Sequence, residues 1–218
     1  MAAISEILQQ RIQSGALSRD PAQIDAAQKL GDVLTRLQTS GKGGWFSKPK
    51  PARGLYLWGG VGRGKSMLMD WFYAEVPIKA KARVHFHAFM LDVHARINER
   101  RKSKDNDGDP IAPVAKDIAK EAKLLCFDEF HVTDITDAMI LSRLFDALWA
   151  EGVIVVATSN RPPEDLYKNG LNRPLFEPFI KRMPEFLIIH EFAGETDHRL
   201  RQLEAAPVYY TPLGADAE

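Results

Sequence analysis

Residues 54–66 read GLYLWGGVGRGKS, and this stretch decides the fold. Residues 59–66 match the pattern G-x-x-x-x-G-K-[ST] at every fixed position. The apolar, aromatic-rich run at 54–58 is typical of a buried strand, and the segment 66–73 is typical of the opening of a helix. A strand, a glycine loop and a helix in this order aim backbone N–H groups at one point, which is an anion site. The stretch therefore predicts that the chain binds a nucleoside triphosphate.

Two side chains of this loop have the chemistry that the phosphates require. We expect the Lys65 ammonium to reach the β- and γ-phosphates, and the Ser66 hydroxyl to be a ligand of Mg²⁺. The remaining positions supply backbone N–H groups. The predicted phosphate-binding residues are Gly59, Gly60, Val61, Gly62, Arg63, Gly64, Lys65 and Ser66.

Short apolar runs follow the loop and alternate with helical patterns. We expect strands at 83–87, 123–127, 152–157 and 185–189, and helices at 89–101, 111–122 and 134–150. Apolar strands separated by helices are typical of a parallel sheet covered on both faces. The predicted fold class is therefore α/β, a P-loop NTPase with a five-stranded parallel sheet. Ligands of such sheets lie at the carboxyl ends of the strands.

The run at 124–129, LLCFDE, is four apolar residues followed by two carboxylates. At the end of a strand both carboxylates can approach the phosphates, so we expect Asp128 to order the Mg²⁺ shell. Glu129 is then placed to polarise the attacking water as a general base. The alternative is a strand end that happens to be acidic, and the glycine loop upstream favours the catalytic interpretation.

Two further residues are candidates for contacts with the γ-phosphate. Asn160 follows the strand expected at 152–157, and its amide can bind the attacking water or the γ-phosphate, although Asn-Arg-Pro-Pro is also a good turn sequence. Arg173 is a candidate arginine finger that would enter the nucleotide site of a neighbouring subunit. A surface salt bridge is the alternative for Arg173, and Arg161 and Lys168 are rival cations.

Composition narrows the class of protein. The chain has 218 residues, with 29 Lys and Arg against 29 Asp and Glu, so its net charge implies no general attraction to nucleic acid. A single cysteine, Cys126, excludes an intramolecular disulfide and fits a reducing compartment. No apolar run is long enough to span a bilayer. We expect a cytoplasmic protein, with a peripheral contact at the inner membrane left open.

The chain divides into four predicted regions. Residues 1–40 are expected to be helical, with Asp20 and Pro21 starting a helix. A basic linker rich in Gly and Pro follows at 41–53, and the nucleotide-binding core is expected at 54–200. Residues 201–218 would begin a C-terminal region.

Several stretches resemble the ZapE family of AAA+ ATPases, which is linked to bacterial cell division and has mitochondrial relatives. The resemblance lies in GLYLWGGVGRGKSMLMD at 54–70, HFHAFM at 85–90, LCFDEF at 125–130, DITDAM at 134–139, ATSN at 157–160 and LYKNGLNR at 166–173. Together these stretches are specific to the family rather than to P-loop proteins in general.

The resemblance implies an AAA+ fold, hydrolysis of ATP with Mg²⁺, nucleotide-dependent homo-oligomers and action on a protein partner. In bacteria that partner is expected to be the division-ring protein FtsZ. Arg173 becomes the expected arginine finger, and Gln23 takes a position from which it would read the adenine edge. Members of the family extend further, so this chain resembles one shortened at its C-terminus.

Two other functions stay open at this point. A P-loop kinase of small molecules shares the loop, but the adjacent carboxylates at 128 and 129 and the position of Arg173 favour hydrolysis. A nucleotide-gated adaptor that barely turns ATP over is the second alternative. The full set of catalytic residues argues against the adaptor, and a shortened C-terminus argues for it.

Overall fold

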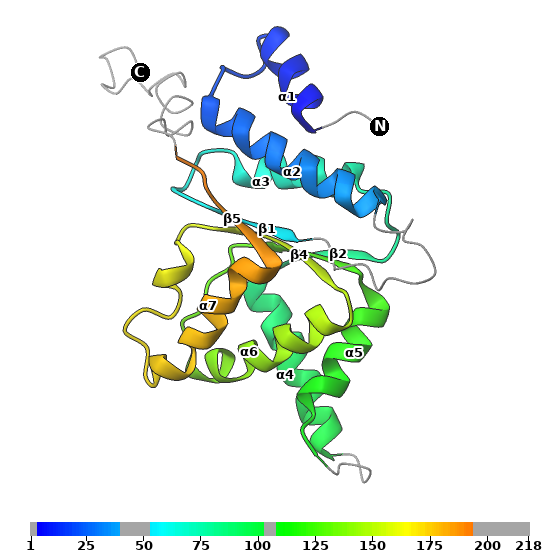
Figure 1. Cartoon of the computed structure of the whole chain (residues 1–218), viewed down its shortest axis with the longest axis vertical. Coiled ribbons are helices and arrows are strands. Elements are labelled where there is room, and N and C mark those ends of the chain that lie inside the picture. Colours follow the sequence, from blue (N-terminus) through cyan, green and yellow to red (C-terminus); the bar gives the residue numbers. More distant parts are fainter. Residues whose placement is uncertain (1–3, 40–52, 103–107, 194–218) are drawn as a thin grey trace, which may run out of the picture.

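The computed structural model of the chain describes residues 4–39, 53–102 and 108–193 (Figure 1). The predicted linker at 41–53, except for Arg53, lies outside these ranges. The predicted C-terminal region at 201–218 and the last residues of the predicted core also lie outside them.

The centre of the molecule is a five-stranded sheet with the strand order β2-β3-β4-β1-β5. Every neighbouring pair of strands is parallel, which confirms the predicted fold class. Because the strands run the same way, their carboxyl ends meet at one edge. The strands are β1 (Gly54–Trp58), β2 (Lys81–His85), β3 (Leu124–Asp128), β4 (Ile154–Ser159) and β5 (Leu187–Glu191).

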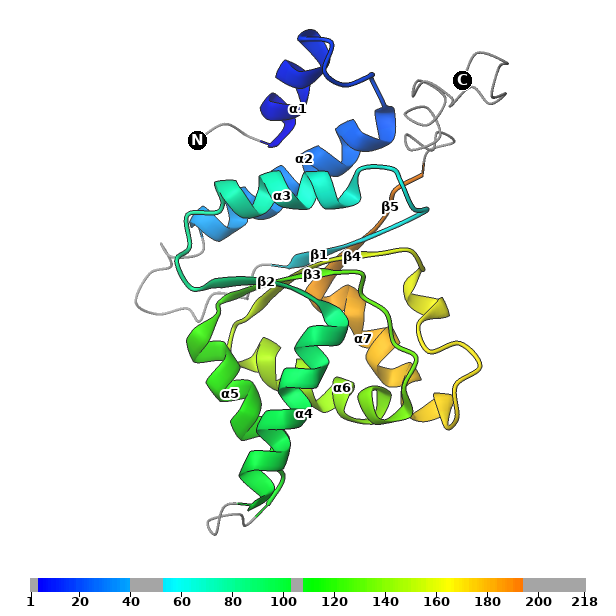
Figure 2. The same ribbon diagram turned by 180° about the vertical axis from the view of Figure 1, so that it is seen from behind.

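Helices cover both faces of this sheet (Figures 1 and 2). On one face lie α1 (Ile4–Gln13), α2 (Pro21–Thr39) and α3 (Lys65–Glu75), and on the other lie α4 (Phe86–Lys102), α5 (Ile111–Glu121), α6 (Ile135–Ala150) and α7 (Glu177–Phe186). Two short 3₁₀ helices, η2 (Pro163–Asp165) and η3 (Arg173–Leu175), join β4 to α7.

Each face of the sheet has its own apolar core, because alternate strand side chains point to opposite faces. Leu55 and Leu57 of β1 are buried in the core beneath α2 and α3, whereas Tyr56 between them is buried in the core beneath α4 to α7. The second core is rich in aromatic rings, and the ring centroids of Phe86 and Phe130 are 4.1 Å apart.

The N-terminal helices pack against the same sheet. Helix α2 starts as expected, since the Asp20 carboxylate accepts from Ala22 N at 2.9 Å and Pro21 takes the first helical position. Its apolar residues Leu30, Val33 and Leu37 are buried in the core that α3 and β1 also form. Among the described residues no helix is both long and apolar enough to cross a membrane.

The structure corrects the expected boundaries near β2 and β4. The strand expected at 83–87 runs from Lys81 to His85, and α4 begins at Phe86 rather than at residue 89. Phe86 is 1% exposed and packs edge-on against Phe127, so the chain turns there into the core. Strand β4 extends to Ser159, because Thr158 and Ser159 continue the pairing with β1.

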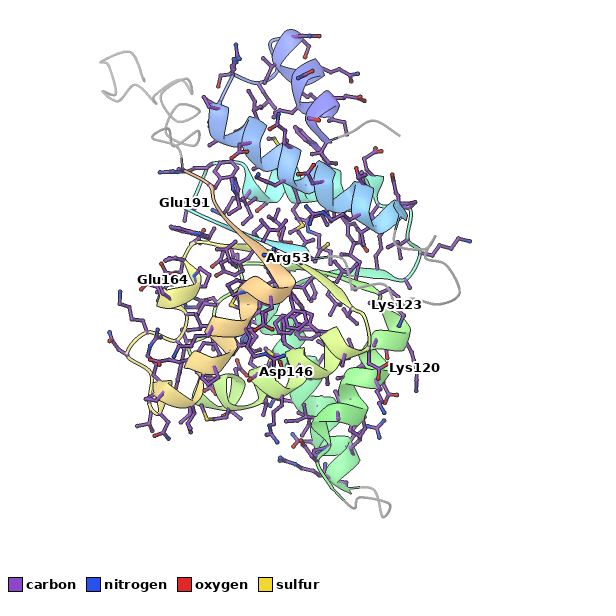
Figure 3. The ribbon with its side chains drawn as sticks, viewed as in Figure 1. Arg53, Lys120, Lys123, Asp146, Glu164 and Glu191 are labelled. Carbon is purple, nitrogen blue, oxygen red and sulfur yellow. The ribbon has the colours of Figure 1, made fainter. Side chains whose placement is uncertain are left out.

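Helix α7 was not among the expected helices. Pro178 and Pro184 interrupt its sequence and indicate a break, yet the helix spans Glu177–Phe186 with Pro184 inside it. Strand β5 therefore starts at Leu187, two residues later than expected. Arg53 secures this junction, since its guanidinium donates to Pro184 O at 2.6 Å and to Leu187 O at 3.0 Å (Figure 3).

Candidate functional site

The glycine loop joins β1 to α3 and has the backbone conformation that glycine permits. Gly59 has φ 154°, and a Cβ there would lie 2.6 Å from Phe192 O. Gly64 has φ 97° and is the N-cap of α3, which begins at Lys65. A side chain at either position would strain the backbone, so the glycines let the loop turn into the N-terminus of α3.

Lys65 is 8% exposed, and its ammonium turns back onto the loop. It donates to Gly59 O at 2.8 Å and to Gly60 O at 2.6 Å. The charged end of the side chain is thus held at the glycine loop, and burial next to carbonyl groups makes it a strong partner for an anion.

A cavity of about 230 Å³ opens in front of the loop. Residues that the sequence predicts as phosphate-binding or catalytic form most of its lining. They come from the loop, from the turn after β3 and from the end of β4. The lining residues are Val61, Gly62, Arg63, Gly64, Lys65, Ser66, Glu129, Thr158, Ser159 and Asn160.

Five predicted site residues do not line this cavity. Gly59 and Gly60 lie behind it, where their carbonyls accept from Lys65. Gln23, Asp128 and Arg173 are held by contacts of their own, described below. Arg63 lines the cavity through the loop, while its guanidinium donates to Phe192 O at 3.3 Å.

Asp128 ends β3 and is bound by an arginine that the sequence analysis did not identify. Arg83 Nε donates to Asp128 Oδ2 at 2.7 Å, and Arg83 Nη2 donates to Asp128 Oδ1 at 3.3 Å. Arg83 Nη1 also pairs with Asp70 of α3. Burial disfavours the charge of Arg83, but its bonds to Asp128 and Asp70 outweigh burial and raise its pKa. Asp128, Arg83 and Asp70 therefore form a three-residue ionic network.

Glu129 follows directly and has φ 55°, a left-handed conformation that non-glycine residues rarely adopt. Its N–H donates to Thr158 Oγ1 at 3.3 Å, and its side chain is exposed at the cavity. The turn is held further by Phe130 N, which donates to Thr158 O at 2.7 Å. Such strain concentrates at functional positions, where the surrounding contacts maintain it.

The sequence predicted Asn160 as a site residue but not Thr158 and Ser159. These two residues connect the parts of the site. Ser159 Oγ donates to Phe130 O at 2.8 Å, and Ser159 O accepts from Gly59 N at 3.1 Å. The end of β4 therefore joins the turn after β3 to the glycine loop. Asn160 is exposed and lines the cavity. The sequence signal for Thr158 and Ser159 is that both are small polar residues at the end of an apolar strand.

Gln23 of α2 lies behind the loop. Its Nε2 donates to Arg63 O at 3.1 Å, and a Cβ at Gly64 would lie 3.1 Å from that nitrogen. The side chain is 3% exposed, and its Oε1 has no hydrogen-bond partner within the described part of the chain. A buried carbonyl oxygen with no partner is costly and rare, so this oxygen is an unused acceptor next to the glycine loop.

Arg173 lies in η3 and is held by its own chain. Its Nη1 donates to Leu166 O at 2.6 Å, and its Nη2 donates to the carbonyl of Glu164, a residue of η2 (Figure 3). Leu171 and Leu175 on either side are 70% and 65% exposed. Arg173 thus sits in an exposed apolar surface outside the cavity.

A second, larger cavity of about 940 Å³ shares Glu129, Ser159 and Asn160 with the first. It lies between α4 and the segment that joins β3 to α6. On its wall, His94 Nε2 and Asp137 Oδ1 are 2.6 Å apart. Glu129 therefore faces open space on both sides, which gives a water molecule access to it.

The family model of the AFG1-like ATPases matches residues 2–218. The chain belongs to this family. It is 52% identical over 180 residues to lactation elevated protein 1 homolog B of Danio rerio, a match that covers 79% of this chain and 36% of that protein. It is 47% identical over 167 residues to cell division protein ZapE of Escherichia coli K12, covering 77% of this chain and 44% of that protein.

Membership of the family confirms the resemblance to ZapE that the sequence motifs indicated. The chain spans less than half the length of these two curated relatives.

Solved structures share the fold at low sequence identity. Domain III of the replication initiation protein DnaA from Thermotoga maritima matches with a TM-score of 0.56 and 16% identity, over 87% of this chain and 70% of that one. DnaI matches with a TM-score of 0.54 and 15% identity, over 83% and 87% of the two chains. At such identity the likeness shows the fold alone, which is that of an AAA+ P-loop domain.

Proposed function

We propose that this chain binds ATP with Mg²⁺ and hydrolyses it as part of a homo-oligomer that acts on a protein partner. One observation supports this most directly. The cavity of about 230 Å³ brings the glycine loop, Lys65 and Ser66 together with Glu129 and Asn160, which come from three separate segments. Membership of the AFG1-like ATPase family agrees with the proposal.

In this proposal the loop and Lys65 hold the triphosphate. Backbone N–H groups at the start of α3 face the phosphate oxygens, and the Lys65 ammonium leaves the carbonyls of Gly59 and Gly60 for the β- and γ-phosphates. A buried ammonium that donates to neutral carbonyls gains when an anion replaces those carbonyls, since charge-assisted bonds are stronger.

The residues present suit Mg²⁺, which prefers oxygen ligands. Ser66 lines the cavity with a hydroxyl, and Asp128 ends the strand that leads to Glu129. Each Asp128 oxygen accepts from Arg83 and has a second lone pair available. Mg²⁺ held by Ser66 and Asp128 would offset charge on the phosphate oxygens.

Hydrolysis requires a water molecule in line with the γ-phosphate. Glu129 takes a proton from that water while the water oxygen forms the bond to phosphorus. The bridging β–γ oxygen leaves with the bonding electrons. Asn160, beside Glu129 in the same cavity, orients the water or the γ-phosphate through its amide. Arg173 acts on the nucleotide of a neighbouring copy, and the exposed Leu171 and Leu175 suit a contact between subunits.

The test is phosphate release together with nucleotide binding in the wild type and in Glu129→Gln. We expect turnover to fall about 10²- to 10⁴-fold while ATP affinity is kept, because the change removes a general base and little else. Glu151→Gln, at an exposed position after α6, is the matched control and should keep full turnover.

Three outcomes would overturn hydrolysis as the function. If Glu129→Gln keeps the turnover of the wild type, Glu129 is not the general base. Binding of ATP without turnover in the wild type would favour a nucleotide-gated adaptor. Transfer of the γ-phosphate to a small acceptor would instead indicate a kinase.

The partner is proposed from the relative in Escherichia coli, which is named a cell division protein. We propose FtsZ as the partner to test first, and the cytoplasm, with a peripheral contact at the inner membrane, as the place of action. FtsZ polymers should scatter less light when this protein and ATP are added. Glu129→Gln with ATP is the control. If FtsZ polymers scatter light equally with the wild type and with this variant, FtsZ is not the partner.

A further inference from the structure

Arg83 stands at the point where the two halves of the proposed Mg²⁺ site meet. It belongs to β2, at the edge of the sheet, and its side chain points to the face that α3 covers. From there one guanidinium contacts both Asp128 of β3 and Asp70 of α3. The two proposed Mg²⁺ ligands are Ser66, on α3, and Asp128, on β3.

Asp70 lies four residues after Ser66, so the two share one face of α3. The contact of Arg83 with Asp70 therefore connects the helix that carries Ser66 to the strand that carries Asp128. The side chain of Asp128 is 12% exposed and that of Arg83 is 21% exposed, so solvent screens their pairing little. The side chain of Asp70 is 61% exposed and forms the weaker end of the network.

The geometry of the contact restricts the Asp128 carboxylate. Arg83 donates from Nε to one carboxylate oxygen and from Nη2 to the other, which fixes the rotation of the carboxylate. The third donor, Nη1, is used for Asp70. A lysine has one compact ammonium and cannot make this planar contact to two carboxylates, although it carries the same charge.

A second anchor on β2 keeps Arg83 in register. Lys81, two residues earlier and on the same face of the strand, donates from Nζ to Val76 O at 2.8 Å, just after α3. Tyr73 OH of α3 donates to Lys81 O at 3.1 Å. Strand β2 is thus attached to α3 at two places, and Arg83 is the one that reaches the end of β3.

We propose that Arg83 is a positioning residue that orients the Asp128 carboxylate relative to Ser66 and thereby sets the affinity of the nucleotide site for Mg²⁺. Arg83 acts through Asp128 and does not itself contact the metal. Groups that orient a metal ligand typically contribute 10- to 100-fold to metal affinity. This inference rests on the proposed binding of nucleotide with Mg²⁺.

The experiment measures the affinity for ADP in Mg²⁺ and in EDTA, and the affinity of the ADP complex for Mn²⁺ by its electron paramagnetic resonance. In Arg83→Lys we expect metal affinity to fall at least tenfold, while the affinity for ADP in EDTA stays that of the wild type. Asp70→Asn should give a smaller loss, because it leaves the contact between Arg83 and Asp128 intact.

Arg96→Lys is a closely matched control. Arg96 also bridges two carboxylates, donating from Nε to Asp92 at 2.7 Å and from Nη1 to Glu121 at 2.6 Å. These residues lie on α4 and α5, and none of them lines the cavity at the glycine loop. Arg83→Lys and Arg96→Lys can lose similar stability, since each breaks a bridge between two carboxylates. Only Arg83→Lys should also lose metal affinity.

The outcomes distinguish the inference from the function beneath it. If the wild type binds ADP equally well in Mg²⁺ and in EDTA, the proposed metal site itself is contradicted. Mg²⁺-dependent binding in the wild type that Arg83→Lys retains would overturn the role of Arg83 alone. Tighter metal binding in Arg83→Gln would show that Arg83 merely neutralises Asp128, which also overturns positioning.

Discussion

At the scale of single residues, the buried Gln23 is the most informative side chain outside the cavity. Its amide nitrogen is held by Arg63 O, which leaves Oε1 as a buried acceptor with no partner in the described residues. The exocyclic amine of adenine is a donor, whereas guanine presents an oxygen at the same place. We therefore predict that Gln23 favours ATP over GTP.

Replacing Gln23 by Leu tests this prediction. We expect ATP affinity to fall about fivefold and GTP affinity to change little, because one buried hydrogen bond contributes roughly 1 kcal/mol. Binding of both nucleotides is measured by titration calorimetry, with Gln28→Leu at an exposed position of α2 as control. Equal losses for ATP and GTP would mean that Gln23 only supports the loop.

Thr158 is the residue that holds Glu129 in its left-handed conformation. Thr158→Val removes Oγ1, the acceptor for Glu129 N–H, but keeps the size and branching of the side chain. Turnover should fall about 10²-fold through misplacement of Glu129, with ATP affinity unchanged. Thr158→Ser keeps the hydroxyl and should recover most of the turnover. Full activity of Thr158→Val would show that the strand alone holds the turn.

At the scale of elements, the start of α6 has a cap whose effect depends on pH. Asp134 is the N-cap, and its carboxylate accepts from Thr136 N at 2.6 Å. Hydrogen bonds from the side chain and backbone of Thr136 lower the pKa of Asp134. A lowered pKa in the folded state means that the stabilisation is present above the ordinary pKa of Asp and is lost as pH falls.

Asp134→Ala should therefore lower the free energy of unfolding by about 0.5–2 kcal/mol at pH 7. The difference from the wild type should begin to shrink below about pH 4, where Asp134 of the unfolded chain takes up a proton. It should be lost below the lowered pKa of the folded state, where the cap itself is protonated. Urea unfolding at several pH values measures it. Asp134→Asn keeps the acceptor oxygen, so its stability should stay near that of the wild type at pH 7. A gap that does not change with pH would contradict the role of the charge.

At the scale of the whole molecule, the proposed finger lines neither of the two cavities that the proposed base lines. Arg173 is in η3 between two exposed leucines, and Glu129 lines the cavities. A single copy therefore does not bring the two together, and we predict that they meet only between neighbouring subunits. Arg173→Ala and Glu129→Gln should each be inactive alone but regain activity when mixed, because each supplies what the other lacks.

Phosphate release in a mixing series measures this recovery, and specific activity of the wild type should rise with its concentration. Lys168→Ala is the matched control, since Lys168 is a neighbouring cation that pairs with Asp165 at 2.8 Å. No recovery on mixing, together with activity that is independent of concentration, would contradict action between subunits.

Much of this architecture follows from local sequence. The glycine loop needs only its own glycines and the adjoining strand and helix, so 59–66 predicts both the turn and the N-terminus of α3. Glu129 and Asn160 were identified because each follows an apolar strand, and parallel strands end at one edge. Helix α7 was missed because its prolines outweigh its apolar pattern locally, while packing of Phe179 and Met183 in the core stabilises it.

The sequence by itself determined the fold class, the family and the residues whose chemistry suits a triphosphate, because each is indicated by short motifs and by local periodicity. Only the tertiary structure decided that Arg83 binds Asp128, 45 residues away, and that Gln23 bonds to Arg63, 40 residues away. The physical reason is that strand order and helix packing place such side chains in contact. Local periodicity shows which face of an element a residue occupies, but not which residue of another element it contacts there.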